Sequence, residues 1–273
     1  MARRGALRWG LGAAALLLTV TGCQGVPGGQ SYAGDVVEAG TFRVLGEDDY
    51  PPRSADEAAI ERVLGIVLRS EDWGPDFVTF EQPDLDLWAT SPLDEQCRIG
   101  YSALPAGTPA AAGVWSLLPR PEHLTGRRNK EDEIWETYQV SAYSSVTVHK
   151  GPLTAAIEVD AFRDGVERCG SQYGDGVTYA GVQGVALEKT GGFDDVAADH
   201  GWFDVKGDGT SVVFRHVGAV ARKGDIVVSV YVDTPVDSEA AAREVGSPVD
   251  LDLRRRASDG LAEMLARIVY RYD

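Results

Sequence analysis

The strongest constraint on the fold is the alternation of apolar and polar residues from position 134 to position 149. Successive side chains of a β-strand point to opposite faces of its sheet, so this period of two predicts a strand. The even positions are mainly apolar: Ile134, Tyr138, Val140, Ala142, Val146 and Val148. The odd positions are polar or aromatic: Trp135, Thr137, Gln139, Ser141, Tyr143, Thr147 and His149. One apolar face is typical of an antiparallel sheet that is covered on one side.

Other segments of the chain complete a mixed pattern of helices and strands. Helical spacing of apolar residues predicts helices over residues 54–73, 152–168, 235–245 and 253–270. Short apolar runs predict further strands over residues 114–118, 177–187, 211–221 and 226–233. We therefore expect an α+β fold, in which an antiparallel sheet has its helices packed on one side. The expected order is helix, meander, helix, meander, helix.

The N-terminal residues have the features of an export signal. Arg3, Arg4 and Arg8 precede an apolar run over residues 11–20, which is shorter than the roughly 20 residues that a membrane-spanning helix needs. Residues 20–23, Val-Thr-Gly-Cys, resemble the bacterial lipobox. That resemblance implies cleavage after residue 22 and a Cys23 that carries acyl chains such as palmitate. The alternative is an ordinary secretory signal with a chance cysteine, and the export route, general or twin-arginine, stays open.

These features predict three parts of the chain and a location. Residues 1–22 form the lipoprotein signal peptide, residues 23–52 form a tether rich in Gly and Pro, and residues 53–273 form one domain. Two or more acyl chains hold a protein firmly on a membrane. We therefore expect attachment to the cell membrane through the N-terminal lipid only, with the domain on the extracytoplasmic side.

The two remaining cysteines, Cys97 and Cys169, are predicted to form a disulfide bond. Disulfide bonds persist in extracytoplasmic compartments, and no third thiol competes once Cys23 is acylated. The alternative is a pair of metal ligands, but two thiols without a nearby histidine bind zinc poorly.

Charge and motifs argue against several functions. The formal net charge of −16 disfavours a nucleic-acid surface, which needs clustered Lys and Arg. The sequence has no nucleophile elbow, zincin helix, P-loop or dinucleotide fingerprint. Its four histidines do not have the spacing of metal ligands, so each is expected to be satisfied or exposed. We predict no catalytic residue, no metal site and no cofactor.

The polar face of the predicted strand over residues 134–149 is a candidate ligand groove. Trp135, Gln139 and Tyr143 share this face by alternation, with an indole at one end and a phenol at the other. Such a row could hold an amphipathic ligand. The alternative is that a helix covers this face and that Trp135 belongs to the core.

Residues 54–273, about four fifths of the chain, also resemble a known family. An Ala-rich helix ends in Glu-Arg-Cys-Gly at residues 167–170, and a hairpin over residues 212–232 precedes a C-terminal helix. Over residues 54–273 this arrangement is similar to the extracellular sensor domain of the actinobacterial receptor kinase PknH and its free lipoprotein relatives. The resemblance implies an α+β fold with a groove and a ligand-binding role.

Together these observations predict a non-catalytic lipoprotein that binds a small molecule or an envelope component. One alternative is an accessory subunit that docks on a protein partner of an envelope complex. Another alternative is an envelope hydrolase that acts on glycans or lipids.

Overall fold

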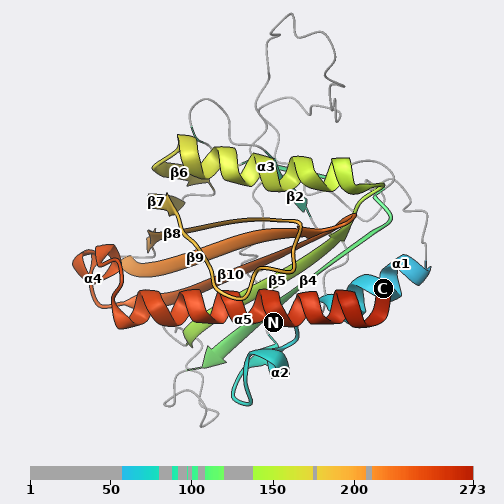
Figure 1. The fold of residues 1–273 in the computed structure, drawn as a ribbon. Helices are drawn as coiled ribbons and strands as arrows, with labels where there is room; N and C mark the ends of the chain where they lie inside the picture. Colours follow the sequence, from blue (N-terminus) through green and yellow to red (C-terminus); the bar gives the residue numbers. More distant parts are fainter. Residues whose placement is uncertain are drawn as a thin grey trace, which may run out of the picture.

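The computed structural model describes residues 57–79, 88–91, 97, 100–103, 108–119, 138–174, 177–206 and 211–272. Within these residues the chain forms an eight-stranded antiparallel sheet with helices, which confirms the predicted α+β class (Figure 1). The predicted signal peptide, the tether and the lipidation site at Cys23 lie outside the described residues.

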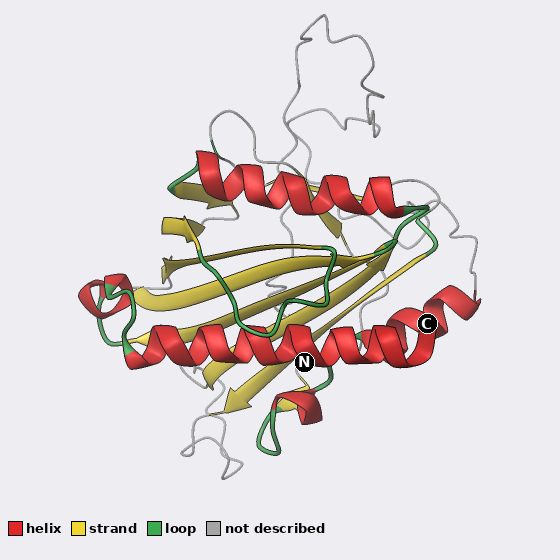
Figure 2. Ribbon diagram, in the orientation of Figure 1, coloured by secondary structure: helices red, strands yellow, loops and turns green. Residues whose placement is uncertain are grey.

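Helices and strands follow one another in blocks along the chain. Figure 2 distinguishes the helices from the strands by colour. The helices are α1 (Glu57–Ile66), α2 (Ser70–Trp73), α3 (Pro152–Arg168), α4 (Glu239–Arg243) and α5 (Pro248–Tyr272). The strands are β1 (Val78–Thr79), β2 (Trp88–Ser91), β3 (Gly100–Ala103), β4 (Ala110–Pro119), β5 (Tyr138–Val148), β6 (Ser171–Gly174), β7 (Val177–Gly184), β8 (Asp195–Lys206), β9 (Ser211–Lys223) and β10 (Ile226–Val236).

The order of the strands in the sheet is β1-β4-β5-β10-β9-β8-β7-β6. The second block of strands, β6 to β10, runs as a continuous meander. In the first block, β2 and β3 pair with each other in a separate two-stranded sheet, so the expected first meander is not confirmed. Pairing of β5 with β10 joins the two blocks, and it brings the last strand of the first block beside the last strand of the second block.

One face of the sheet packs against α5 and α1. Apolar side chains of α5 recur every three or four residues and are buried on this face: Leu253, Ala257, Leu261, Met264 and Ile268. They meet alternate residues of the central strands, such as Val228 and Val230 of β10 and Ala219 of β9. This layer is the largest hydrophobic core among the described residues.

The opposite face packs against α3, which corrects the expectation that the helices lie on one side. Ala155 and Val159 of α3 contact Ala197 of β8, Val220 of β9 and Val227 of β10. In Figure 1 the sheet passes between α3 and α5. The reason is that the central strands carry apolar residues at consecutive positions, so both faces of the sheet must be buried.

The ends of the last helices also differ from the prediction. Pro235 lies in β10, where the pattern predicts the start of a helix over residues 235–245. The short helix α4 begins only after Ser238, whose hydroxyl accepts a hydrogen bond from the N–H three residues along. Helix α5 begins at Pro248, five residues before the predicted start, because proline suits the first helical position.

The predicted disulfide bond between Cys97 and Cys169 is present, with 5.7 Å between the two Cα atoms. Cys169 follows the last residue of α3, and Cys97 lies between β2 and β3. The bond therefore ties the end of α3 to a distant part of the chain. Among the described residues, no helix combines the length and the apolar character that crossing a membrane requires.

Candidate functional site

The residues of the predicted groove are only partly described. Trp135 lies outside the described residues. Gln139 is exposed on β5, and Tyr143 is half-buried, with its ring centroid 6.3 Å from that of Tyr231. Val140 belongs to the core under α5, so alternation puts Tyr143 on the face that carries α3. The groove itself stays a prediction.

Beside Tyr231 lies a group of polar and aromatic side chains on the α3 face, which we call the His216 cluster. It consists of His216, Asp199, Asp233, Tyr179, Phe203 and Tyr231. Strand pairing brings them together. His216 of β9 pairs with Asp233 of β10, and Gly218 pairs with Asp199 of β8 on one side and with Tyr231 on the other.

The imidazole of His216 lies between two carboxylates and is almost fully buried, with 6% exposure. Its Nδ1 donates to Oδ1 of Asp233 at 2.5 Å, and its Nε2 lies 3.8 Å from Oδ1 of Asp199. The Tyr231 ring stacks on the imidazole, and the Tyr179 ring meets it edge-on. The cluster is thus a buried charged centre inside an aromatic shell.

Gly218 makes room for this arrangement. A Cβ atom at this position would lie 2.7 Å from Oδ1 of Asp199 and 3.0 Å from Nε2 of His216. It would also lie 3.0 Å from the Tyr231 ring. A side chain here would therefore push apart the three groups that meet above the glycine.

The pKa values in the cluster respond to burial and to the opposed charges. Burial by itself would lower the pKa of His216, but the carboxylates of Asp233 and Asp199 outweigh it, so the pKa is raised. Burial raises the pKa of the Asp199 carboxyl, although the neighbouring imidazole opposes this. The imidazolium form of His216 is thus favoured, and its charge is needed to balance the two carboxylates.

A second buried cluster lies on the α5 face, and we call it the Asp250 cluster. It consists of Asp250, Arg215, His200 and Arg254. Asp250 has no exposed surface, and its Oδ1 accepts hydrogen bonds from Arg215 at 2.5 and 3.0 Å. Its Oδ2 pairs with Arg254 at 2.7 Å and accepts the Gly246 N–H.

The Asp250 cluster joins α4 and α5 to the sheet. Burial alone would raise the pKa of Asp250, but hydrogen bonds from Arg215 and Gly246 lower it to about 2, so the carboxylate stays ionised. Burial lowers the pKa of His200, although the contact with Asp250 opposes this effect. The ring therefore stays neutral, and its Nδ1 accepts a hydrogen bond from the guanidinium of Arg215. Arg215 also donates to the carbonyl of Ala242 in α4. We assign this cluster a structural role.

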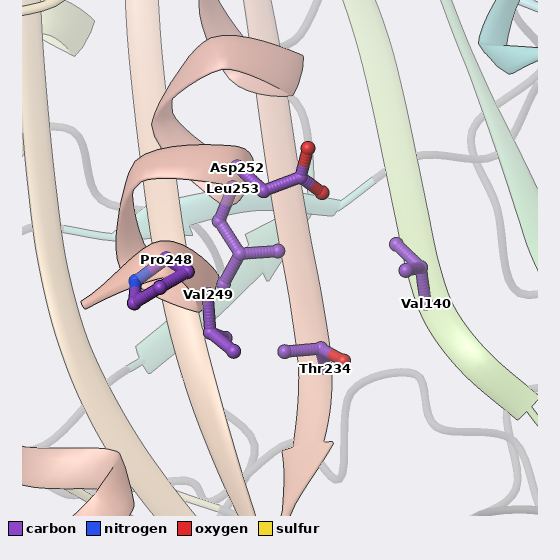
Figure 3. A pocket seen from close by; sticks show the side chains of 6 residues that line it. All are labelled: Val140, Thr234, Pro248, Val249, Asp252 and Leu253. Atoms are coloured by element: carbon purple, nitrogen blue, oxygen red, sulfur yellow. The ribbon is translucent and has the colours of Figure 1, made fainter.

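A pocket of about 230 Å³ opens on the α5 face, where α5 begins beside β5 and β10 (Figure 3). It is lined by Val140, Thr234, Pro248, Val249, Asp252 and Leu253. The polar groups at its rim already have partners. The Thr234 hydroxyl donates to the Gln139 carbonyl, and the Asp252 carboxylate accepts from Arg255 and Arg256. The interior is therefore suited to an apolar group.

Among the described residues, the predicted groove residues Gln139 and Tyr143 are not part of the lining of this pocket. Gln139 contributes only its carbonyl to the hydrogen bond at the rim, and Tyr143 points to the other face of the sheet. Sequence reasoning also missed both buried clusters. The signal that could have found them is the pair Arg215-His216 inside an apolar strand, because a charged residue in such a place needs a partner. Among the described residues, no three His, Cys, Asp or Glu side chains are arranged to hold a metal ion.

Comparison with solved structures gives a distant structural similarity. No family model matches the sequence, and no curated protein matches it. The chain is similar to the crystal structure of the extracellular domain of PknH from Mycobacterium tuberculosis, at 14% identity and a TM-score of 0.47. The match covers 77% of this chain and 96% of that chain. The expected resemblance is thus supported only as a distant structural similarity, and we draw nothing about function from it.

Proposed function

We propose that this protein is a lipoprotein of the extracytoplasmic membrane surface, anchored through Cys23, whose domain binds a ligand without catalysing a reaction. The disulfide bond between Cys97 and Cys169 supports the extracytoplasmic location, because such bonds persist in oxidising compartments. The lipobox at residues 20–23 supports the anchor. The observation that carries ligand binding is the apolar pocket at the start of α5.

The shape and chemistry of the pocket favour an amphipathic envelope molecule. Sites for drug-sized ligands usually measure roughly 300–1,000 Å³, so a pocket of about 230 Å³ holds one apolar portion of a ligand. Val249 at its edge is 39% exposed, and so an apolar chain can reach the interior. The polar part of the ligand would remain in solvent near Asp252.

The buried clusters do not suit a hydrolase. A hydrolase of glycans needs two carboxyl groups that reach the substrate from a cleft. Asp199 and His216 are 5% and 6% exposed, and Asp250 has no exposed surface. Substrate would not reach these groups without a rearrangement of the sheet. Ligand binding at the open pocket needs no such change.

Photo-crosslinking tests ligand binding at the pocket. The full protein in lipid nanodiscs is treated with an alkyl glucoside that carries a diazirine in its alkyl tail. We expect crosslinked peptides from the α5 start and from the strand that contains Thr234. Val249→Glu should lower their yield by at least about tenfold, because a carboxylate would enter an apolar site.

Val269→Glu is the matched control, since Val269 is another exposed valine of α5, near the far end of the helix. It should leave the crosslinking yield unchanged. Crosslinks that do not map to the pocket, or a yield that Val249→Glu does not change, would refute this ligand site.

A further inference from the structure

We propose that the His216 cluster is a pH-responsive switch within the sheet. The protonated imidazole of His216 attracts the carboxylates of Asp199 on β8 and Asp233 on β10, and loss of the proton removes this electrostatic attraction. This inference goes beyond ligand binding and does not depend on it. It rests on the positions of the buried His216 and Asp199, of the half-buried Asp233, and of the rings that surround them.

The geometry favours a charged imidazole. Each ring nitrogen of His216 faces a carboxylate oxygen, at 2.5 Å for Asp233 and at 3.8 Å for Asp199. A neutral imidazole has one N–H, so it could present a donor to one carboxylate and only a lone pair to the other. The imidazolium carries an N–H on both nitrogens and suits both neighbours.

His216 supplies the positive charge that faces Asp199, in addition to backbone hydrogen bonds from Gly218 and from Asp199 itself. The Oδ1 atom of Asp199 is buried and has no hydrogen-bond partner among the described residues. This atom faces the imidazole, which is its nearest positive charge when protonated. Burial raises the pKa of the Asp199 carboxyl and the imidazolium of His216 opposes this, so a neutral His216 would make the ionised form of Asp199 less favourable. The charge states of the two residues are therefore coupled.

The groups around His216 come from four strands. Asp199 faces it from β8, Tyr179 from β7, and Asp233 and Tyr231 from β10. Arg215, the preceding residue in β9, opposes its protonation through space, although it binds Asp250 on the other face of the sheet. The two carboxylates outweigh this repulsion, and the pKa of His216 is raised.

The direction of the pH effect follows from these pKa values. The pKa of His216 is raised above 6.5, the ordinary pKa of histidine, so protonation of His216 stabilises the fold. This stabilisation is complete below pH 6.5 and is lost as the pH rises through the pKa of His216 in the folded protein. The raised pKa of Asp199 means that ionisation of this carboxyl also disfavours the fold as the pH rises above 3.8. Both groups therefore make the sheet less stable as the pH rises.

The switch has a route to the protein surface. The Tyr231 ring stacks on His216, with 6.0 Å between the ring centroids, and also contacts the half-buried ring of Tyr143. When His216 loses its proton, repulsion between the two carboxylates acts directly beside Tyr231. A change at the centre of the cluster thus reaches the side chains of the predicted groove.

The test is the NMR titration of His216 in the full protein labelled with ¹³C-histidine. We expect its pKa to lie above 6.5 in the wild-type protein. Asp199→Asn should lower it by at least about one pH unit, because it removes one of the two neighbouring negative charges. The thermal midpoint of the wild-type protein should fall between about pH 6 and pH 9, and it should fall less in Asp199→Asn.

Asp195→Asn is the matched control. Asp195 is also on β8, but it pairs with Arg163 of α3 and does not contact His216. This variant should leave the His216 titration unchanged. A wild-type pKa at or below 6.5, or an equal effect of the two substitutions, would overturn the proposal. The wild-type titration decides the matter even where Asp199→Asn does not fold.

Discussion

Asp250→Ala is expected to lower the free energy of unfolding by about 3–5 kcal/mol, which is a large part of the stability of an ordinary domain. The Asp250 carboxylate is fully buried and accepts hydrogen bonds from Arg215 and Gly246. Its removal leaves the guanidinium of Arg215, with 2% exposure, without its buried anion. Arg254 and His200 would then place their polar atoms around an empty space.

Urea denaturation of the wild-type protein and two variants measures this effect. Asp259→Ala is the control, because Asp259 lies on the same helix but is 41% exposed and pairs with Lys189 and Arg255 at the surface. Surface ion pairs contribute at most about 1 kcal/mol, so this control should change little. Equal losses in the two variants would contradict the structural role of the Asp250 cluster.

Acid should weaken the same cluster. The pKa of Asp250 lies at about 2 in the folded protein, below its ordinary value of 3.8. Its contribution is therefore present above pH 3.8 and is lost as the pH falls toward 2. This effect opposes that of the His216 cluster, which favours acid. Asp250 thus makes the fold less stable as the pH falls toward 2, and His216 makes it less stable as the pH rises through its raised pKa.

Loss of the disulfide bond is the second large effect that we expect. Cys97 and Cys169 are 72 residues apart, and closing a loop of this length in the unfolded chain corresponds to about 4 kcal/mol. The double variant Cys97→Ser/Cys169→Ser should therefore unfold at a clearly lower urea concentration than the wild-type protein. It should also lose the attachment between the end of α3 and the segment that contains Cys97.

Thermal unfolding with and without a thiol reductant provides the control. The reductant should lower the midpoint of the wild-type protein and leave the double serine variant unchanged. A wild-type midpoint that does not respond, under conditions where free thiols are shown to appear, would mean that the bond adds little to stability.

Local patterns were enough to predict much of the sheet. Alternation predicts β5, and the turn at residues 222–225 predicts the hairpin of β9 and β10. The apolar spacing and Pro152 predict α3 with the bounds that the structure has. These signals come from residues close together in the chain, where periodicity and turn preference act directly.

Strand β8 shows why other parts could not be predicted. Its middle contains Asp199, His200 and Gly201, which on their own are typical of a loop. In the structure their polar groups lie close to distant partners, Asp250 for His200 and His216 for Asp199. A pattern read along the chain does not contain these pairings, so the strand and both clusters were missed together.

Gly201 has a separate reason for its place in this strand. A Cβ atom there would lie 3.1 Å from the carbonyl oxygen of Ala180 in β7. The register of β7 and β8 shifts between Ala180 and Gln183, so the two backbones approach closely at this point. The glycine therefore serves the pairing of two strands, which the sequence of β8 alone does not reveal.

The central claim, a lipid-anchored extracytoplasmic protein, is tested most directly at Cys23. Bacteria that express the full chain are fed a clickable fatty acid, and the membrane-bound protein is examined by gel and by mass spectrometry of its N-terminal peptide. We predict label on the wild-type protein, an N-terminus at an acylated Cys23, and neither in Cys23→Ser, whose precursor keeps residues 1–22. Label that persists in Cys23→Ser, or a wild-type N-terminus without acyl chains, would contradict the anchor.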